Sequence, residues 1–232
     1  QVYSFIWCIK MQFVYHPNAG LQTLRVDTRE YEHIFKVRRI SVGETLWWRN
    51  LEDSFVYEYQ ISQIGKKEAE LECIGQKELP ILPSKVFHLG WSIIDPKIIE
   101  KTLPMLNELG VSKISFVYAE FSQKNHKLDM ERIKRILINS SQQCGRSLLM
   151  QIEIFSSIHH YIEAYPKSAV LDFAEKKLNS NEEISSLLVG PEGGFSTKER
   201  NLLQNQPIIG LICNTILRSE TAVVAAASKI LA

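Results

Sequence analysis

The chain has 232 residues, of which 45% are hydrophobic and 23% are charged, and its formal net charge is +1. This length suits a small domain joined to a medium one, and the composition is that of an ordinary globular protein, which excludes extensive disorder. A net charge near zero also excludes a uniformly basic surface, so any contact with nucleic acid has to rest on local basic patches.

Targeting and metal-binding signals are sparse. No stretch reaches the roughly 20 apolar residues that a membrane-spanning helix needs, and residues 1–10 lack the features of a signal peptide. We therefore expect a cytoplasmic protein with no membrane partner. The four cysteines lie far apart without a ligand spacing and the six histidines are scattered, so we expect free thiols and no metal site.

The first part of the chain is rich in β-forming residues and interrupted by turns. The predicted strands are Phe13–Tyr15, Thr45–Trp48, Phe55–Ile64 and Ala69–Ile74. One helix is predicted over Glu30–Arg39, with basic residues at its end. A β-rich module of this kind, over residues 11–79, is compatible with RNA binding, although the pattern alone does not decide it.

Pro80 and Pro83 indicate a linker over residues 80–85, after which strands and helices alternate. Strands are predicted at Val86–Trp91, Ile114–Tyr118, Gln151–Phe155, Ala169–Phe173, Leu187–Gly190 and Ile208–Ile212. Helices are predicted at Asp95–Leu109, Leu128–Cys144, Thr197–Leu203 and Ser219–Leu231. This alternation predicts an α/β domain over residues 86–232 with a mainly parallel sheet.

A glycine-rich turn, GPEGGFS, follows the strand that ends near Gly190. Ser196 and Glu199, three residues apart, predict a capping box that opens a helix. Glycines at such a turn permit positive φ and let a ligand lie against the main chain. The turn fits neither GxGxxG nor the P-loop pattern, so it does not indicate a phosphate site, and a plain strand-to-helix connection is the alternative.

A second motif, ILRSETA, opens a helix rich in small residues. Ser219 is predicted to be the N-cap of this helix, and Glu220 suits the positive first turn. Arg218 has no purpose in that structural interpretation. The run of alanines from Ala222 to Ala227 predicts close packing against another element or against a second subunit.

GPEGGFS followed by ILRSETA resembles the bacterial family that methylates N3 of a uridine in 16S ribosomal RNA, a branch of the trefoil-knotted SPOUT methyltransferases. The likeness extends to Glu108–Val111, to Gln143–Arg146 and to an N-terminal pattern that starts at His33, and it covers Met11–Ala232. Residues 1–10 match nothing in the family, so we expect the functional chain to begin at Met11.

The resemblance implies an N-terminal PUA-like domain, which is small and barrel-like, and a C-terminal trefoil-knotted α/β methyltransferase domain. It implies a homodimer that acts on 16S ribosomal RNA in the small ribosomal subunit and uses S-adenosylmethionine as its cofactor. The expected cofactor residues are Leu188, Gly190, Gly193, Gly194, Leu211, Ile212, Asn214, Ile216, Leu217 and Thr221. Cys213 stands where the family usually has glycine, and its effect on cofactor binding is left open.

The resemblance also suggests roles in the reaction. Arg218 is the candidate cation that stabilises charge on the uracil oxygens, and Glu220 is the candidate base. A salt bridge and helix capping are their structural alternatives. The residues expected to contact RNA are His33, Lys36, Arg39, Lys124, Gln143 and Arg146. For Arg146, a cation that serves the carbonyl groups at a helix end is the alternative.

Two other functions share part of this pattern. A knotted methyltransferase that acts on transfer RNA or on a ribose 2′-hydroxyl would share the two loops but not the N-terminal pattern. A non-catalytic RNA-binding assembly factor would keep the N-terminal module and lose the cofactor loops, and both loops are intact here.

Overall fold

The computed structural model describes residues 13–27, 31, 34, 40–122, 127–179 and 183–232. The chain divides into two compact units, Gln1–Leu82 with Ile138–Leu149, and Pro83–Leu137 with Met150–Ala232. The limits predicted from the sequence divide the chain once, at a linker over residues 80–85, whereas the first unit also includes Ile138–Leu149. Those limits remain a prediction. Most of the predicted helix Glu30–Arg39 lies outside the described residues, as do residues 1–12. In the described part of the chain, no helix is both long and apolar enough to cross a membrane.

The first unit contains a five-stranded sheet in the order β1-β3-β4-β5-β2. Its strands are β1 (Val14–Tyr15), β2 (Thr23–Asp27), β3 (Thr45–Arg49), β4 (Phe55–Ile64) and β5 (Glu68–Glu78). The strand β2 was not predicted, because Leu24 and Val26 are its only apolar residues. Antiparallel pairing with β5 stabilises β2 and buries these two side chains.

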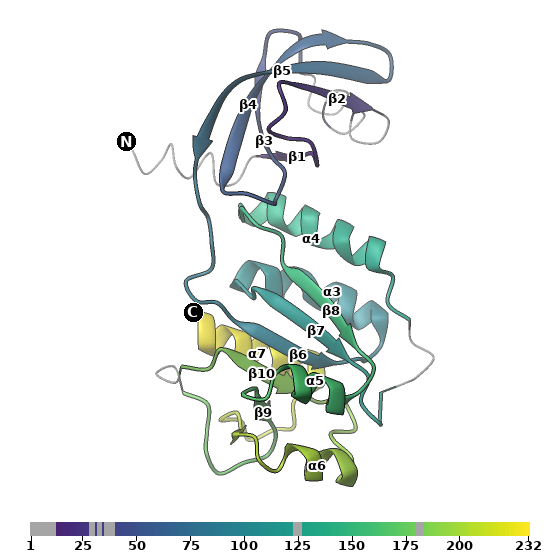
Figure 1. The fold of residues 1–232 in the computed structure, drawn as a ribbon, viewed down its shortest axis with the longest axis vertical. Helices are drawn as coiled ribbons and strands as arrows, with labels where there is room; N and C mark the ends of the chain where they lie inside the picture. Colours follow the sequence, from purple (N-terminus) through teal and green to yellow (C-terminus); the bar gives the residue numbers. More distant parts are fainter. Residues whose placement is uncertain (1–12, 28–30, 32–33, 35–39, 123–126, 180–182) are drawn as a thin grey trace. The chain divides into compact units, whose positions relative to one another are not determined.

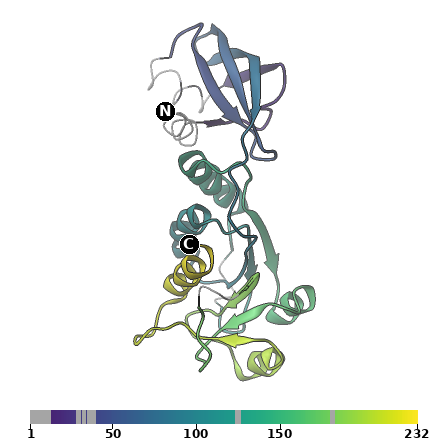
Figure 2. The same ribbon diagram turned by 90° about the vertical axis from the view of Figure 1, so that its left-hand side faces the viewer.

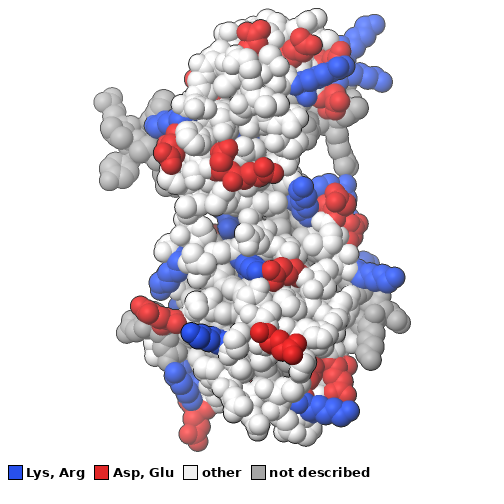
Figure 3. All heavy atoms as spheres, in the orientation of Figure 1, with Lys and Arg blue, Asp and Glu red and all other residues white. Residues whose placement is uncertain are grey.

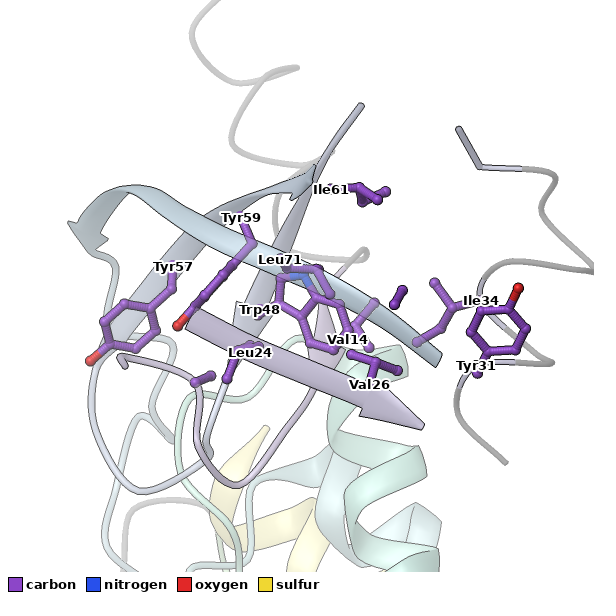
Figure 4. Packing of buried hydrophobic residues seen from close by; sticks show 12 residues of the cluster. Val14, Leu24, Val26, Tyr31, Ile34, Trp48, Tyr57, Tyr59, Ile61 and Leu71 are labelled. Atoms are coloured by element: carbon purple, nitrogen blue, oxygen red, sulfur yellow. The ribbon is translucent and has the colours of Figure 1, made fainter. Parts of the chain in front are cut away.

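The core of this unit is built from aromatic and branched side chains that the strands direct to one side. Trp48, Tyr59 and Leu71 are fully buried, and the rings of Trp48 and Tyr59 meet edge to face with their centroids 6.4 Å apart. Figure 4 shows Leu24 and Val26 of β2 closing over the same cluster. Burial of each large side chain is worth about 1.5–3 kcal/mol, so this cluster is the main stabilising feature of the unit.

Arg49, at the end of β3, is a buried cation with only 1% of its surface exposed. Its Nη1 donates hydrogen bonds to the Phe55 carbonyl at 3.1 Å and the Ser147 hydroxyl at 3.2 Å, and its Nη2 donates to the Leu79 carbonyl at 2.8 Å. Burial lowers the pKa of the guanidinium, which nevertheless stays charged. Arg49 therefore ties the segment around Ser147, distant in sequence, to the N-terminal sheet.

We expect Arg49→Ala to lower the free energy of unfolding by roughly 3 kcal/mol, because it leaves buried carbonyl groups without donors and opens a cavity. The measurement is chemical denaturation followed by circular dichroism. Arg25→Ala is the matched control, since Arg25 is an exposed arginine paired with Glu68, and its loss should change the midpoint little. Equal midpoints for the two variants would contradict this role for Arg49.

The second unit contains a six-stranded, entirely parallel sheet in the order β11-β9-β10-β6-β7-β8. The strands are β6 (His88–Ser92), β7 (Lys113–Val117), β8 (Gln151–Phe155), β9 (Ala169–Leu171), β10 (Ser186–Val189) and β11 (Ile208–Ile209). The predicted α/β class is confirmed. All six strands were predicted. The strands β9 and β11 end earlier than expected, because the chain turns there into loops.

Helices cover both faces of this sheet, with α3 and α7 on one side and α5, beside α6, on the other (Figures 1 and 2). The helices are α3 (Pro96–Leu109), α4 (Met130–Cys144), α5 (Ile158–Ala164), α6 (Thr197–Leu203) and α7 (Ser219–Leu231). Asp95 caps the start of α3, and Gly110 ends it with φ 100°. The helix α5 was not predicted, because seven residues with only Ile158 and Tyr161 buried give a weak periodic signal.

The alanine run of α7 is explained within one chain. Ala226 and Ala227 are fully buried and Ala222 is nearly so, and α7 packs against α3. Small side chains permit this close approach of two helices. The alanine run therefore does not by itself indicate a second subunit.

Candidate functional site

A cavity of about 410 Å³ lies where β9, β10 and β11 end. Parallel strands present their carboxyl ends at one edge of the sheet, which is where ligands bind in open α/β folds. The loops that follow the three strands contribute lining residues that include Asp172, Lys177, Gly190–Phe195, Leu211 and Ile216, and α7 adds Ser219 and Ala222. Residues as far apart in the sequence as Asp172 and Ala222 therefore surround one space.

The structure brings together six of the ten residues expected to bind the cofactor. The residues that line the cavity are Gly190, Gly193, Gly194, Leu211, Ile216 and Leu217. The other four do not line the cavity. Leu188 is buried within β10, and the side chains of Ile212, Asn214 and Thr221 are exposed. The sequence motif could not separate these groups, because the curvature of the loop decides which of its residues face the cavity.

Backbone conformation and packing explain two glycines of the glycine-rich turn. Gly194 has φ +70°, a backbone conformation that residues with a Cβ rarely adopt. A Cβ added to Gly190 would lie 3.2 Å from the ring of Phe195. The capping box of Ser196 and Glu199 is confirmed, with each side chain bonded to the other residue's backbone N–H, so the turn is held firmly at the start of α6.

Ser219 links the two sequence motifs directly. Its hydroxyl donates a hydrogen bond of 2.7 Å to the Gly190 carbonyl and accepts one of 3.0 Å from the indole N–H of Trp91. The prediction that Ser219 caps α7 is wrong: Arg218 occupies the N-cap position without a side-chain hydrogen bond. The serine hydroxyl is used instead to attach the start of α7 to the glycine turn.

Three charged residues outside the two motifs also line the cavity and were not predicted, namely Asp172, Lys177 and Arg200. Arg200 forms an ion pair with Asp172 and donates a hydrogen bond of 3.2 Å to the Phe195 carbonyl. The only sequence signals for this pair are a carboxylate near the end of a predicted strand and an arginine directly after the capping box. Their pairing depends on the tertiary fold.

Arg218 and Glu220, the candidate catalytic residues, lie beside the cavity. Arg218 is exposed and stands between Leu217 and Ser219, which both line it. Glu220 is half-buried, and one of its carboxylate oxygens is buried without a hydrogen-bond partner among the described residues. Within the same described part of the chain, Arg218 forms no ion pair with Glu220 or Glu192, the structural alternative considered for it.

The six residues expected to contact RNA differ in whether the structure describes them. His33, Lys36, Arg39 and Lys124 lie outside the described residues. Gln143 is exposed on α4. Arg146 is only 7% exposed and burial lowers its pKa, which favours the structural alternative over RNA contact. Figure 3 shows basic and acidic side chains interspersed over the face that it draws, as the small net charge suggests.

A buried polar network surrounds His88, at the start of β6. Nε2 of the ring is 2.8 Å from the Ser115 hydroxyl, and Nδ1 is 3.1 Å from the Ser186 hydroxyl. Ser115 in turn donates a 3.0 Å hydrogen bond to Glu153. Burial, together with the nearby Lys113, outweighs the opposing effect of Glu153 and lowers the pKa of His88 to about 4. The imidazole is therefore neutral in the folded protein at pH 7.

We expect this histidine to make stability fall in acid. Its pKa is about 4 when folded and 6.5 when unfolded, so the unfolded chain binds the proton first. The contribution of His88 to the free energy of unfolding is fully present above about pH 6.5. It is lost as the pH falls toward 4, and the total loss is roughly 3 kcal/mol. Urea denaturation at pH 7.5 and pH 5 measures the effect. His88→Gln should flatten the pH dependence, and an unchanged slope would refute the assignment.

Comparison with known proteins shows likeness over nearly the whole chain. Residues 82–231 match the RNA methyltransferase domain family, and residues 26–73 match the RNA methyltransferase PUA domain family. The expected PUA-like N-terminal domain is thereby confirmed, while the knot stays a prediction.

Individual relatives agree with these family matches. The chain is 45% identical to ribosomal RNA small subunit methyltransferase E of Helicobacter pylori strain J99, covering 94% of this chain and 98% of the relative. It is 28% identical to the enzyme of the same name from Aquifex aeolicus, covering 86% and 90%. The solved structure of the Neisseria gonorrhoeae enzyme of that name, bound to S-adenosyl methionine, superposes with a TM-score of 0.80 at 21% identity, covering 94% and 95%. At this identity, the likeness to the solved structure shows the fold alone.

Proposed function

This chain belongs to the RNA methyltransferase family that matches residues 82–231, and from this membership we propose that it methylates N3 of a uridine in 16S ribosomal RNA with S-adenosylmethionine. The observation that carries the proposal is the cavity of about 410 Å³ in which the GPEGGFS turn and the ILRSETA segment meet. The relative from Helicobacter pylori is named as a small-subunit ribosomal RNA methyltransferase, which supports the same class of substrate.

The cavity suits S-adenosylmethionine in size and chemistry. Its volume falls within the range of about 300–1,000 Å³ that is usual for ligand sites. Leu211 and Leu217 provide apolar surface for the adenosine, and Gly193 and Gly194 leave main-chain groups open to it. Glu192 adds a carboxylate to the lining, which suits a positively charged ligand. The bound cofactor supplies an electrophilic methyl group on its sulfonium.

Two tasks in the reaction fall to residues of this chain: removal of one proton and stabilisation of one developing negative charge. Loss of the N3 proton would spread negative charge onto the uracil oxygens. The N3 lone pair would then bond to the methyl carbon as the bond from that carbon to sulfur breaks, with S-adenosylhomocysteine as the leaving group. Arg218, beside the cavity lining, stabilises that charge. Glu220 accepts the proton, a role supported by its buried carboxylate oxygen without a hydrogen-bond partner in the described residues. Holding both groups in place also lowers the barrier by orientation.

We assign recognition of the RNA to the N-terminal unit, because residues 26–73 match the PUA domain of RNA methyltransferases. His33, Lys36 and Arg39 contact phosphates in this proposal and fix the register of the RNA. Gln143 and Lys124 are two further RNA contacts in this proposal. Since the substrate is ribosomal RNA, the protein acts in the cytoplasm.

We further propose a homodimer with a knotted C-terminal domain. Phe173, Ile212 and Ile216 are large apolar side chains with 81%, 72% and 83% of their surface exposed. Phe173 and Ile216 line the cavity, and Ile212 belongs to the same loop as Ile216. Apolar groups gathered in this way favour burial by a second copy. Sedimentation at micromolar concentration should give a dimer, and Ile216→Asp should weaken it.

The test of the function is to incubate the protein and S-adenosylmethionine with assembled small subunits, and separately with naked RNA. Mass spectrometry of the digested RNA should locate one 3-methyluridine. A methyl group on a ribose, or on transfer RNA supplied as competitor, would instead identify another knotted methyltransferase. Cofactor binding without transfer to any RNA would refute the proposal and favour a non-catalytic assembly factor.

A further inference from the structure

The helix α5 carries a cluster of metal-ligating side chains whose residues are distinct from those of the cofactor cavity. His159, His160 and Glu163 are exposed, and one ligand atom from each lies within 4.8 Å of the others. We propose that these three residues bind one divalent transition-metal ion, such as Zn²⁺. From the sequence we expected no metal site, because the six histidines are scattered along the chain. The structure, however, places His159 and His160 close to Glu163.

The pair formed by His159 and Glu163 already has the spacing of two ligands on one metal. The two residues are four apart and share a face of the helix, as in helical metal motifs. His159 Nδ1 lies 3.4 Å from Glu163 Oε2. With bonds of about 2.0–2.2 Å to the metal, neighbouring ligands of a tetrahedral zinc ion are about 3.4 Å apart. An ion can therefore enter between these two atoms with little rearrangement.

His160 supplies the third ligand, and its ring is already oriented. Nδ1 of His160 lies 2.7 Å from the Ser156 hydroxyl, so we assign Nε2 as the atom that binds the metal. A hydrogen bond to the second ring nitrogen is the usual way in which proteins orient a ligating histidine. The helix itself is held by the buried side chains of Ile158 and Tyr161, so binding orders only the three exposed side chains.

The surroundings favour a cation, and the donor types favour a transition metal. A second cavity, of about 450 Å³, lies beside the cluster, and His159 is part of its lining. Among the described residues, that lining contains Glu120 and Glu199 and no lysine or arginine. Two imidazoles with one carboxylate suit Zn²⁺, Ni²⁺ or Cu²⁺ better than Mg²⁺ or Ca²⁺, which prefer oxygen ligands. Three protein ligands leave at least one position for water.

The test is a titration of the full chain, stripped of metal with a chelator, with Zn²⁺ in competition with a colorimetric zinc indicator at pH 7.5. We expect one ion per chain with a micromolar or lower dissociation constant. His159→Ala and Glu163→Gln should each weaken binding on the order of 10-fold or more. Glu131→Gln is the matched control, because it removes an exposed carboxylate from α4 and should leave zinc affinity unchanged.

A spectroscopic measurement gives an independent readout. With one equivalent of Cu²⁺, electron paramagnetic resonance should show nitrogen coupling that is reduced in His160→Ala. Because all three side chains are exposed, the variants should keep the circular dichroism spectrum of the parent protein. Zinc affinity equal to that of the parent in both His159→Ala and Glu163→Gln, or binding only in the millimolar range, would overturn the proposal.

Discussion

Gly194→Val is expected to abolish binding of S-adenosylmethionine. Gly194 has φ +70°, which a β-branched side chain adopts only at a considerable cost in energy. Relaxing this strain would move the turn that lines the cavity, and the added methyl groups would occupy space against which the ligand lies. Isothermal titration calorimetry should show affinity reduced by at least about 100-fold, which corresponds to roughly 2.7 kcal/mol.

The matched control is Gly43→Val. Gly43 also has a positive φ, of 90°, but a Cβ there meets nothing within 4 Å, and it does not belong to the cavity lining. This variant carries a similar backbone strain in the N-terminal unit and should bind the cofactor like the parent protein. Unchanged cofactor affinity in folded Gly194→Val would move the cofactor site away from the glycine turn.

Arg218→Ala is expected to lower the rate constant of methyl transfer by a factor on the order of 10² to 10³, as loss of one donor to a developing oxyanion does in other enzymes. Arg218 adjoins the cavity lining without forming part of it. If its charge acts on the uracil oxygens only as the proton leaves, cofactor affinity should change by less than about threefold. Single-turnover kinetics and calorimetry measure the two quantities separately.

Lys198→Ala is the control for this variant. Lys198 is an exposed cation on α6 and does not line the cavity, so its removal changes net charge without touching the site. Its rate constant should stay close to that of the parent protein. A rate loss in Arg218→Ala that is matched by an equal loss of cofactor affinity would show that Arg218 binds the ground state, and would remove it from the chemical step.

Local signals predicted many elements of the second unit well, because their stabilising contacts are close in sequence. The helix α6 was predicted with its limits at Thr197 and Leu203, since the capping box that starts it is formed by residues three apart. Asp95 and Gly110 mark the two ends of α3 for the same reason. Where local signals were weak, as in β2 and α5, pairing or packing with distant residues decided the structure.

The sequence by itself determined the family, the α/β class and the two motifs of the cofactor region, because a motif retains the residue types that its chemistry needs. Only the tertiary structure decided how the motifs are used. Ser219 looks like a helix cap in the sequence, yet its hydroxyl holds Gly190 and Trp91. Likewise, Asp172 pairs with Arg200 across 28 residues. Parallel strands bring the ends of distant segments together at one edge, and that juxtaposition has no local signature in the chain.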